Sequence, residues 1–450
     1  MNTPFITRKP NRMKCVAEAA RRTPIAGDAD VVVCGGGPAG IAAALAAARN
    51  GAKTCLIEVH GCLGGVWTAG LLTWLFEMEQ PGITREITRE LDRRGARRGG
   101  SRDRYAYDVE AMKLLLEDLC RAAKIDVHLH TRLAAAAKDQ RRVRAAITES
   151  KSGREAWSAR CFIDATGDGD LAALSGCGFS IGRPGSGECQ PMTYMALMSV
   201  RNVNAVSPCI SFWGGADGRS FRSHWAASKK FTAELQRAGI TPSYAVPTLF
   251  QVQGNLLALM INHEYGVSAI DARKITAATL RGRAEVNRVV NALRAVGGRW
   301  KDLHLVATCE QIGVREGRRI HGHDTVTQDD LIAGSRHADA VCRVAFAIDI
   351  HCTNPAQGKG QETPAVRTKP YDVPVRALIA RDVDNLLLAG RCISGDFIAH
   401  SSYRVTGVAV ATGQAAGVTA ALSARHDKLP KDILWPHIQD ALRKTIWTIL

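Results

Sequence analysis

The hydrophobic pattern near the start of the chain predicts a strand, a helix and a second strand. Residues 30–34 are almost all apolar, the Ala-rich stretch 38–50 ends before a glycine, and a second apolar run occupies 54–59. Short apolar runs that flank an apolar helix are typical of parallel strands buried on both faces. The beginning of the chain is therefore expected to form a βαβ unit of a parallel sheet.

A similar pair recurs near the end of the chain. A strand-like run at 383–394 precedes an Ala-rich helical stretch at 404–424. Between the two regions, Gly and Pro punctuate short strand-like runs from about residue 176, and a helical stretch covers 271–296. This pattern predicts that the chain leaves its first domain, forms a second one and then returns.

The loop after the first strand carries glycines at the spacing G-x-G-x-x-G, within the run Gly35, Gly37, Pro38, Ala39 and Gly40. The first glycine permits a tight turn, the second lets a pyrophosphate approach the backbone, and the third lets helix and strand pack closely. Glu58 follows 18 residues after the last glycine, where a carboxylate accepts hydrogen bonds from ribose hydroxyls. The motif predicts an adenosine dinucleotide site, and this acid disfavours the 2′-phosphate of NADP.

Five further blocks make the pattern more specific: GCLGGVWTAG at 61–70, FIDATGDGDLA at 162–172, IGVREGRRIHG at 312–322, NLLLAGRCIS at 385–394 and AHSSYRVTGVAVATGQAAG at 399–417. With the glycine motif, they resemble the FAD-dependent oxidoreductase family related to the succinate dehydrogenase and fumarate reductase flavoproteins, over about residues 28–425. The resemblance implies FAD as cofactor. It also implies an α/β fold: a Rossmann-like FAD/NAD(P)-binding domain of the glutathione reductase type with an inserted α+β substrate domain.

The domain limits follow from the pattern and the resemblance together. We expect a leader at 1–28, an FAD-binding domain in two parts at 29–175 and 369–425, an inserted domain at 176–368, and a C-terminal helix at 426–450.

The resemblance also implies which further residues contact FAD. The loop after Glu58 would follow the flavin, the turn after the strand at 160–165 would lie by the adenosine half, and the late strand would end near the pyrophosphate or ribityl chain. The helix that begins near residue 405 would point its N-terminus at the flavin pyrimidine ring, where it stabilises negative charge. The residues concerned are Gly64, Gly65, Thr68, Ala165, Thr166, Gly167, Gly390, Arg391, Val405, Thr406 and Gly407.

Two features depart from the simplest pattern. Related disulfide reductases place an Asp after the late glycine to hold the ribityl chain, whereas Arg391 stands here and the nearest candidate acid is Asp396. His60 and Cys62 follow the ribose acid closely, and both residue types can form a covalent bond to a flavin. Their position beside the adenosine contact favours non-covalent FAD.

The sequence shows no motif for an electron donor other than the substrate, which favours substrate oxidation. The chain has no second G-x-G-x-x-G after a strand and no CxxC pair, so it shows neither an NAD(P)H domain nor a disulfide relay. We therefore predict a dehydrogenase or oxidase that moves a hydride from a small polar substrate (an alcohol, sugar, hydroxy acid or amino acid) to flavin N5. Oxygen or an external acceptor would reoxidise the flavin. Alkene reduction, a flavin monooxygenase and a flavin-dependent RNA-modifying or RNA-binding protein stay open as alternatives; a halogenase is disfavoured because no GxWxWxIP-type motif is found.

Such a reaction needs a base and a group that holds the substrate. His400 is the first candidate base because it precedes the helix expected to face the flavin, and Tyr403 and Arg404 follow it; His351 is the second candidate. The 312–322 block offers four residues for substrate binding, Arg315, Glu316, Arg318 and Arg319, of which we select Arg318 and Arg319. The alternative is that Glu316 and the arginines form a buried structural network.

Composition and charge set the remaining expectations. The net charge of +16 is partly concentrated in the arginines of 91–104, which form either a solvated loop or a contact for an anionic partner. No aromatic residues interleave these arginines, so a nucleic-acid partner is disfavoured. The 13 cysteines form no CxxC pair, which argues against disulfides, zinc and iron–sulfur clusters. We expect a cytoplasmic protein with no signal sequence, no membrane span and no metal, and with a possible homo-oligomeric state.

Overall fold

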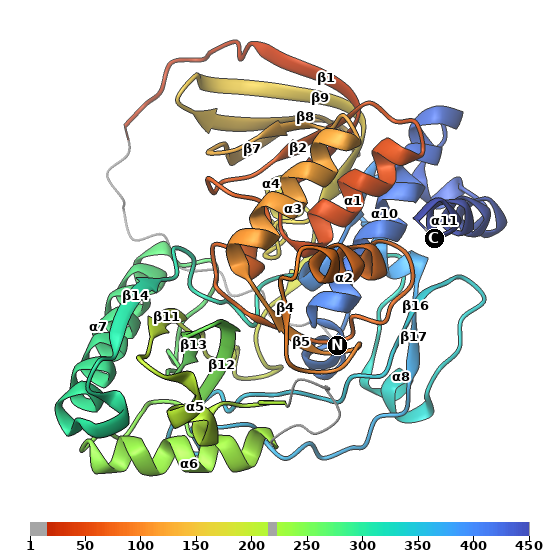
Figure 1. Ribbon diagram of the computed structural model, residues 1–450. Helices are drawn as coiled ribbons and strands as arrows, with labels where there is room; N and C mark the ends of the chain where they lie inside the picture. The colour runs from red at the N-terminus through yellow and green to blue at the C-terminus, as the bar shows by residue number, and fades with distance from the viewer. Residues whose placement is uncertain (1–15, 215–222, 450) are drawn as a thin grey trace.

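A computed structural model, shown in Figure 1, describes residues 16–214 and 223–449. Within them the largest sheet has seven strands in the order β6-β2-β1-β9-β8-β7, and β18 also pairs with β9. The strands β1, β2, β6, β18 and the second half of β9 run parallel, whereas β7, β8 and the first half of β9 form an antiparallel meander. Their bounds are Ile25–Cys34 (β1), Thr54–Ile57 (β2), Asp126–His128 (β6), Arg132–Asp139 (β7), Arg142–Ser150 (β8), Gly153–Asp164 (β9) and Leu386–Leu388 (β18).

The centre of this sheet is apolar on both faces. Val31, Val32 and Val33 of β1 are fully buried, and β1 lies between β2 and β9. The helix α1 (Pro38–Arg49) connects β1 to β2, as the alternation of apolar runs predicted. The α/β class is therefore confirmed, and β18 returns to the first sheet more than 200 residues after β9 left it.

The helix α10 (Thr406–His426), near the end of the chain, packs against α1, near its beginning. A Cβ atom added at Gly413 would lie 2.1 Å from the carbonyl oxygen of Ala39, and one at Gly417 would lie 2.1 Å from that of Ala43. These glycines, one helical turn apart, let the two backbones touch. Among the described residues α10 is the one helix long and apolar enough to cross a membrane, but residues 407–424 are buried inside the protein.

The other helices near this sheet are α2 (Ile83–Arg93), α3 (Val109–Ala122), α4 (Asp170–Leu174), α9 (Phe397–Tyr403) and α11 (Trp435–Ile449). Asp108 caps α3, since its side chain accepts hydrogen bonds from the N–H groups of Glu110 and Ala111. A small sheet of β3 (Trp74–Leu75), β5 (Tyr105–Tyr107) and β4 (Arg97–Arg98) extends from this region toward β12.

A second layer is built on an antiparallel sheet, visible below the first one in Figure 1. Its order is β12-β13-β11-β14, and α5 (Val203–Val206), α6 (His224–Arg237) and α7 (Ala272–Val296) accompany it. The strands are Ala196–Ser199 (β11), Thr248–Gln253 (β12), Leu256–Met260 (β13) and His304–Thr308 (β14). The helix predicted at 271–296 is thus α7.

The predicted domain limits cross some of these pairings. β16 (Ala340–Val344) pairs with β17 (Tyr371–Pro374), which lies on the other side of the limit at 368. The pairing of β10 (Phe179–Ser180) with β15 (Arg319–Ile320) crosses no limit, because both strands lie within 176–368, as does α8 (Gln328–Ala333). β1 begins at Ile25, inside the predicted leader, of which residues 1–15 lie outside the described part. The limits themselves stay a prediction.

Candidate active site

A cavity of about 1250 Å³ opens at the carboxyl ends of the parallel strands. At this edge it is lined by the residues that directly follow β1, β2, β9 and β18, among them Gly35, Glu58, Ala165, Gly390 and Arg391. Ligands of open α/β sheets bind outside the carboxyl ends of the strands, where neighbouring connections diverge. The other walls come from the second layer and from the segment 346–351, so the cavity lies between the two layers.

The three motif glycines have different surroundings. Gly35 has φ +100°, and a Cβ there would lie 2.5 Å from the carbonyl oxygen of Ala165. A Cβ at Gly40 would lie 1.7 Å from the carbonyl oxygen of Gly35, so α1 and β1 pack too closely for a side chain. A Cβ at Gly37, by contrast, would meet no atom within 4 Å. Gly37 therefore presents bare backbone to the cavity, at the N-terminus of α1.

The carboxylate of Glu58 is held in place at the same edge. It is almost completely buried, and its oxygens accept hydrogen bonds from the backbone N–H of Gly36 at 2.6 Å and of His60 at 2.8 Å. Each oxygen keeps a second lone pair, which can accept a ribose hydroxyl. Because α1 has no side-chain cap, its first N–H groups are available to an anion. This donor and acceptor set fits a ribose joined to a pyrophosphate.

A chain of polar side chains borders the cavity where Tyr244, Asp349 and His351 line it. We call this part the polar end. His351 Nδ1 lies 3.1 Å from His263 Nε2, and His263 Nδ1 lies 3.2 Å from the hydroxyl of Tyr265. On the other side, His351 Nε2 lies 3.4 Å from Asp349 Oδ1. The ring of Tyr244 packs against that of His263 with centroids 4.1 Å apart. Of these residues, Tyr244, Asp349 and His351 line the cavity.

Two guanidinium groups lie beside this chain. Arg404 donates a hydrogen bond to the backbone carbonyl of Asp349, and its Nη2 lies 3.4 Å from Asp349 Oδ2. Arg315 donates to the carbonyl of Pro191 at 2.8 Å and to Thr193 Oγ1 at 2.7 Å. Within the described part of the chain Arg315 forms no ion pair, although it lines the cavity. This end of the cavity therefore has a net positive charge.

Burial and these charges shift the pKa values of the group. Burial, reinforced by the nearby Arg315, lowers the pKa of His351 to about 4, so the imidazole is neutral at pH 7. Burial raises the pKa of Asp349, but the combined effect of His351, Arg404 and Arg315 is stronger. The pKa is therefore below its usual range, and the carboxyl is ionised. Burial and Arg404 lower the pKa of Arg315 to about 10, which leaves it charged at neutral pH. Burial raises the pKa of Tyr244 to about 12.

The comparison with known families decides the identity of the nucleotide site. The sequence model of the family described as FAD dependent oxidoreductase matches residues 30–442. The chain belongs to the FAD-dependent oxidoreductase family.

Solved structures of flavoenzymes are similar to this FAD-dependent oxidoreductase. p-Nitrophenol 4-monooxygenase PnpA from Pseudomonas putida is 10% identical, with 94% of this chain and 88% of that chain covered and a TM-score of 0.50. The flavin-dependent monooxygenase PieE, in complex with FAD and substrate, is 12% identical over 93% of this chain and 62% of that chain, with a TM-score of 0.48. A geranylgeranyl bacteriochlorophyll reductase-like protein from Thermoplasma acidophilum is 13% identical over 94% and 83%, with a TM-score of 0.43. No curated protein sequence matches the chain.

Most of the residues predicted to contact FAD line the cavity of the oxidoreductase. They are Gly35, Gly37, Pro38, Ala39, Glu58, Gly65, Ala165, Thr166, Gly167, Gly390, Arg391, Val405 and Thr406. Gly40, Gly64, Thr68 and Gly407 are not among the lining residues. Thr68 donates to the carbonyl of Leu63 at 2.5 Å, and a Cβ at Gly407 would lie 2.0 Å from the carbonyl oxygen of Glu77. The structure thus gives these residues a part in shaping the loops around the FAD site.

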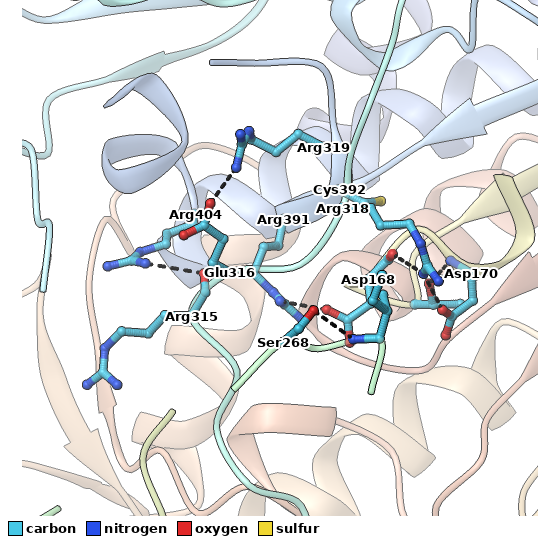
Figure 2. A network of polar contacts seen from close by, with 12 residues as sticks. Asp168, Asp170, Ser268, Arg315, Glu316, Arg318, Arg319, Arg391, Cys392 and Arg404 are labelled. Atoms are coloured by element: carbon cyan, nitrogen blue, oxygen red, sulfur yellow. Dashed lines mark hydrogen bonds and ion pairs between the residues drawn. The ribbon is translucent and has the colours of Figure 1, made fainter. Parts of the chain in front are cut away.

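The arginines of the 312–322 block separate into different roles, as Figure 2 shows. Arg319 forms a fully buried ion pair with Glu316 and does not line the cavity, which favours the structural alternative for this pair. Arg318 lines the cavity near its nucleotide end, where it donates to Asp170 at 2.8 Å. Arg315, for which the sequence left substrate binding and the buried network open, points away from the Glu316 pair and lines the cavity.

Arg391, which stands where related reductases carry an acid, lies 2.8 Å from Asp168 Oδ1 in the same view. Asp396 instead caps α9: its carboxylate accepts from the N–H groups of Ala399 at 2.7 Å and Gln328 at 2.6 Å, and it does not line the cavity. His60 lines the nucleotide end, whereas Cys62 does not line the cavity.

His400 and Tyr403 lie outside the cavity. His400 is completely buried, and neither ring nitrogen has a hydrogen-bond partner among the described residues. Burial, with the neighbouring Arg404, lowers the pKa of His400 well below its usual range. Tyr403 packs edge-to-face on it at 5.5 Å and donates its hydroxyl to the carbonyl of Ile393. Of the candidate catalytic residues, the structure places His351 and Arg404 on the cavity and His400 behind its wall.

Sequence reasoning missed Asp349 and His263. Asp349 stands two residues before His351 in an extended segment, and that spacing was an available signal. His263 lies 88 residues before His351, in the segment that follows β13, and no sequence pattern joined the two.

The remaining expectations concern metal and charge. Cys55, Asp126 and His128 place ligand atoms within 4.8 Å of one another, but burial raises the pKa of Cys55 to about 12, and a protonated thiol binds metal poorly. In the 91–104 cluster, neighbouring acids pair with Arg93, Arg94, Arg97 and Arg104. This pairing favours the solvated loop. Arg104 also lines the cavity.

Proposed function

We propose that this FAD-dependent oxidoreductase is a dehydrogenase or oxidase for a substrate that carries an anionic group and an oxidisable C–H carbon bearing a hydroxyl or amino group. One observation carries the proposal: an ion-pair-free Arg315 and a neutral His351 line the same cavity as the glycine loop and Glu58. Bound FAD supplies a two-electron acceptor at N5. The chain supplies the base, the anion site and the exclusion of water.

The hydrogen bonds leave one nitrogen of His351 free to act as a base. The hydroxyl of Tyr265 lies 3.5 Å from the carbonyl of Ser243, to which it can donate. His263 Nδ1–H then donates to Tyr265, and His351 Nδ1–H donates to His263. We assign the tautomer that leaves His351 Nε2 unprotonated. This nitrogen takes the proton from the substrate hydroxyl or amine, and the Nε2–H so formed lies 3.4 Å from Asp349 Oδ1.

Asp349 supports that transfer. An imidazolium formed at His351 lies 3.4 Å from the Asp349 carboxylate, which stabilises the positive charge. Gln361 donates to the carboxylate of Asp349, and Arg404 Nη2 lies 3.4 Å from its Oδ2. The proton can then pass along His263 to the half-buried Tyr265, which releases its own hydroxyl proton to solvent. Asp349 is therefore a positioning residue and His351 the catalytic residue in this proposal.

The charge balance supports an anionic substrate. Arg315 and Arg404 contribute two positive charges, Asp349 contributes one negative charge, and the histidines are neutral. A substrate carboxylate or phosphate beside Arg315 would complete this balance and fix the reacting carbon near His351.

The test is anaerobic reduction of the protein-bound FAD by a panel of hydroxy acids, amino acids, sugars and neutral alcohols. We expect an anionic member to bleach the flavin at about 450 nm without NADH or NADPH. His351→Gln should slow bleaching about 10²–10⁴-fold, the usual contribution of a general base, whereas His437→Gln on exposed α11 should not. Arg315→Met should raise the half-saturating concentration of the anion. Product hydroxylation that requires NAD(P)H and oxygen would instead identify a monooxygenase.

A further inference from the structure

The cavity has a third region, separate from the residues around Glu58 and from those around His351. Trp74, Phe212, His224 and Phe250 all line it, and we name them the aromatic wall. They come from four separate segments: β3, the residues before the undescribed stretch, the start of α6, and β12. Met195, Met260 and Phe346 line the cavity as well.

The rings of the aromatic wall are nearly parallel. Trp74 stacks on Phe212 with centroids 4.0 Å apart and planes at 10°, and on Phe250 at 5.4 Å and 13°. Phe212 lies parallel to His224 at 5.6 Å and 10°. Offset stacking, in which the ring planes are parallel, is one of the two arrangements that aromatic pairs prefer. Parallel rings from four segments that all line one cavity suit a further flat ring.

The backbone at Phe212 is strained. Its φ is +56°, a conformation that is rare for a bulky residue. Residues with such strained backbones persist where the surrounding structure enforces them, and they are frequent at ligand sites. Here the strain accompanies a half-buried Phe212 ring that is stacked on Trp74 and lines the cavity.

His224 acts in the wall as an uncharged ring. Ser211 Oγ lies 3.1 Å from His224 Nδ1 and fixes the ring plane. Burial lowers the pKa of His224, so its face is that of a neutral imidazole at pH 7. Arg104 also lines the cavity, and its guanidinium lies 5.8 Å from the centre of the Phe76 ring.

We propose that the aromatic wall is a stacking subsite for a planar aromatic portion of the substrate. The wall and the anion site around Arg315 line one continuous cavity, so the substrate class is an aromatic compound that also carries an anionic group. The inference rests on the proposed function in that it takes the same cavity as the substrate site. Its test measures binding, and it therefore does not depend on turnover.

The experiment uses the FAD-loaded protein and two probes of equal charge, 2-naphthoate and decahydro-2-naphthoate, with 2-naphthamide as a neutral planar probe. Dissociation constants are measured by calorimetry and by the change in flavin absorption. We expect 2-naphthoate to bind at least tenfold more tightly than its saturated analogue, because only the flat ring can stack. Phe212→Leu should abolish this preference and keep FAD, whereas Phe179→Leu, a half-exposed phenylalanine outside the cavity, should leave it unchanged.

Equal binding of the two carboxylates, or a preference that survives in Phe212→Leu, would overturn the proposal. Loss of FAD from a folded Phe212→Leu would also overturn it, because the wall would then hold the flavin ring. The neutral probe separates the two proposals. If 2-naphthamide binds as tightly as 2-naphthoate and Arg315→Met changes neither, the stacking subsite stands and the anion site fails.

Discussion

His351 Nδ1 and His263 Nε2 lie 3.1 Å apart, and both side chains are almost completely buried. A single proton occupies the space between these two nitrogens, so the orientation of one imidazole sets that of the other. This pair links the cavity to Tyr265, which is half-buried. The reaction proposed for the protein therefore depends on a residue that does not itself line the cavity.

Replacing His263 tests that dependence. His263→Phe removes the acceptor of the His351 Nδ1–H and should slow anaerobic flavin reduction at least tenfold while FAD is retained. His263→Gln keeps a hydrogen-bonding group but cannot pass a proton, and it should stay slow with a larger solvent isotope effect. Stopped-flow reduction in H₂O and D₂O gives both quantities. Full recovery of the rate in His263→Gln would show that His263 only positions His351.

The pH dependence of reduction follows from the pKa of His351. Burial lowers this pKa to about 4, and the base must be unprotonated to react. The rate at saturating substrate should therefore be nearly constant from pH 8 to pH 5 and should fall as the pH passes below about 4. Above about pH 10, loss of the Arg315 charge should weaken binding of an anionic substrate. A rate that rises through about pH 6.5, an unperturbed imidazole value, would contradict this assignment.

Gly37→Val should give a folded protein without FAD. The Cβ at Gly37 meets no protein atom, and its φ of −72° suits any residue, so the substitution does not disturb the chain. The new side chain instead fills the space expected for the pyrophosphate. Circular dichroism and the absorbance ratio at 450 and 280 nm report folding and FAD separately. Gly40→Val is the contrasting variant, since its Cβ would lie 1.7 Å from the carbonyl oxygen of Gly35 and should prevent folding.

His400→Phe should keep FAD and the parent rate of flavin reduction. The residue lies outside the cavity, and both ring nitrogens are buried without hydrogen-bond partners in the described structure. An unsatisfied buried polar group costs about 1–3 kcal/mol, so an apolar ring of similar size should not lower the melting temperature. A rate loss of 100-fold or more with FAD retained would restore His400 as the base, and His351→Gln would then have little effect.

The nucleotide end could be predicted from the sequence because its chemistry is local. The turn at Gly35, the bare backbone at Gly37 and the acid at Glu58 all belong to one βαβ unit, and their spacing follows from the lengths of a strand and a helix. A parallel strand that is buried on both faces also shows a continuous run of apolar residues in the sequence, as the second half of β1 does. The fold class and the adenosine dinucleotide site therefore required no knowledge of distant contacts, whereas FAD itself was implied by the family resemblance of distant blocks.

The substrate end depended on contacts between segments far apart in the chain. His263 and His351 meet across 88 residues, and Trp74 stacks on Phe212 and Phe250 from three different segments. His400 stands next to the helix expected to face the flavin, but the short helix α9 turns its side chain into the core. Sequence spacing determines which residues share an element, whereas the packing of one layer on the other determines which of them face the cavity.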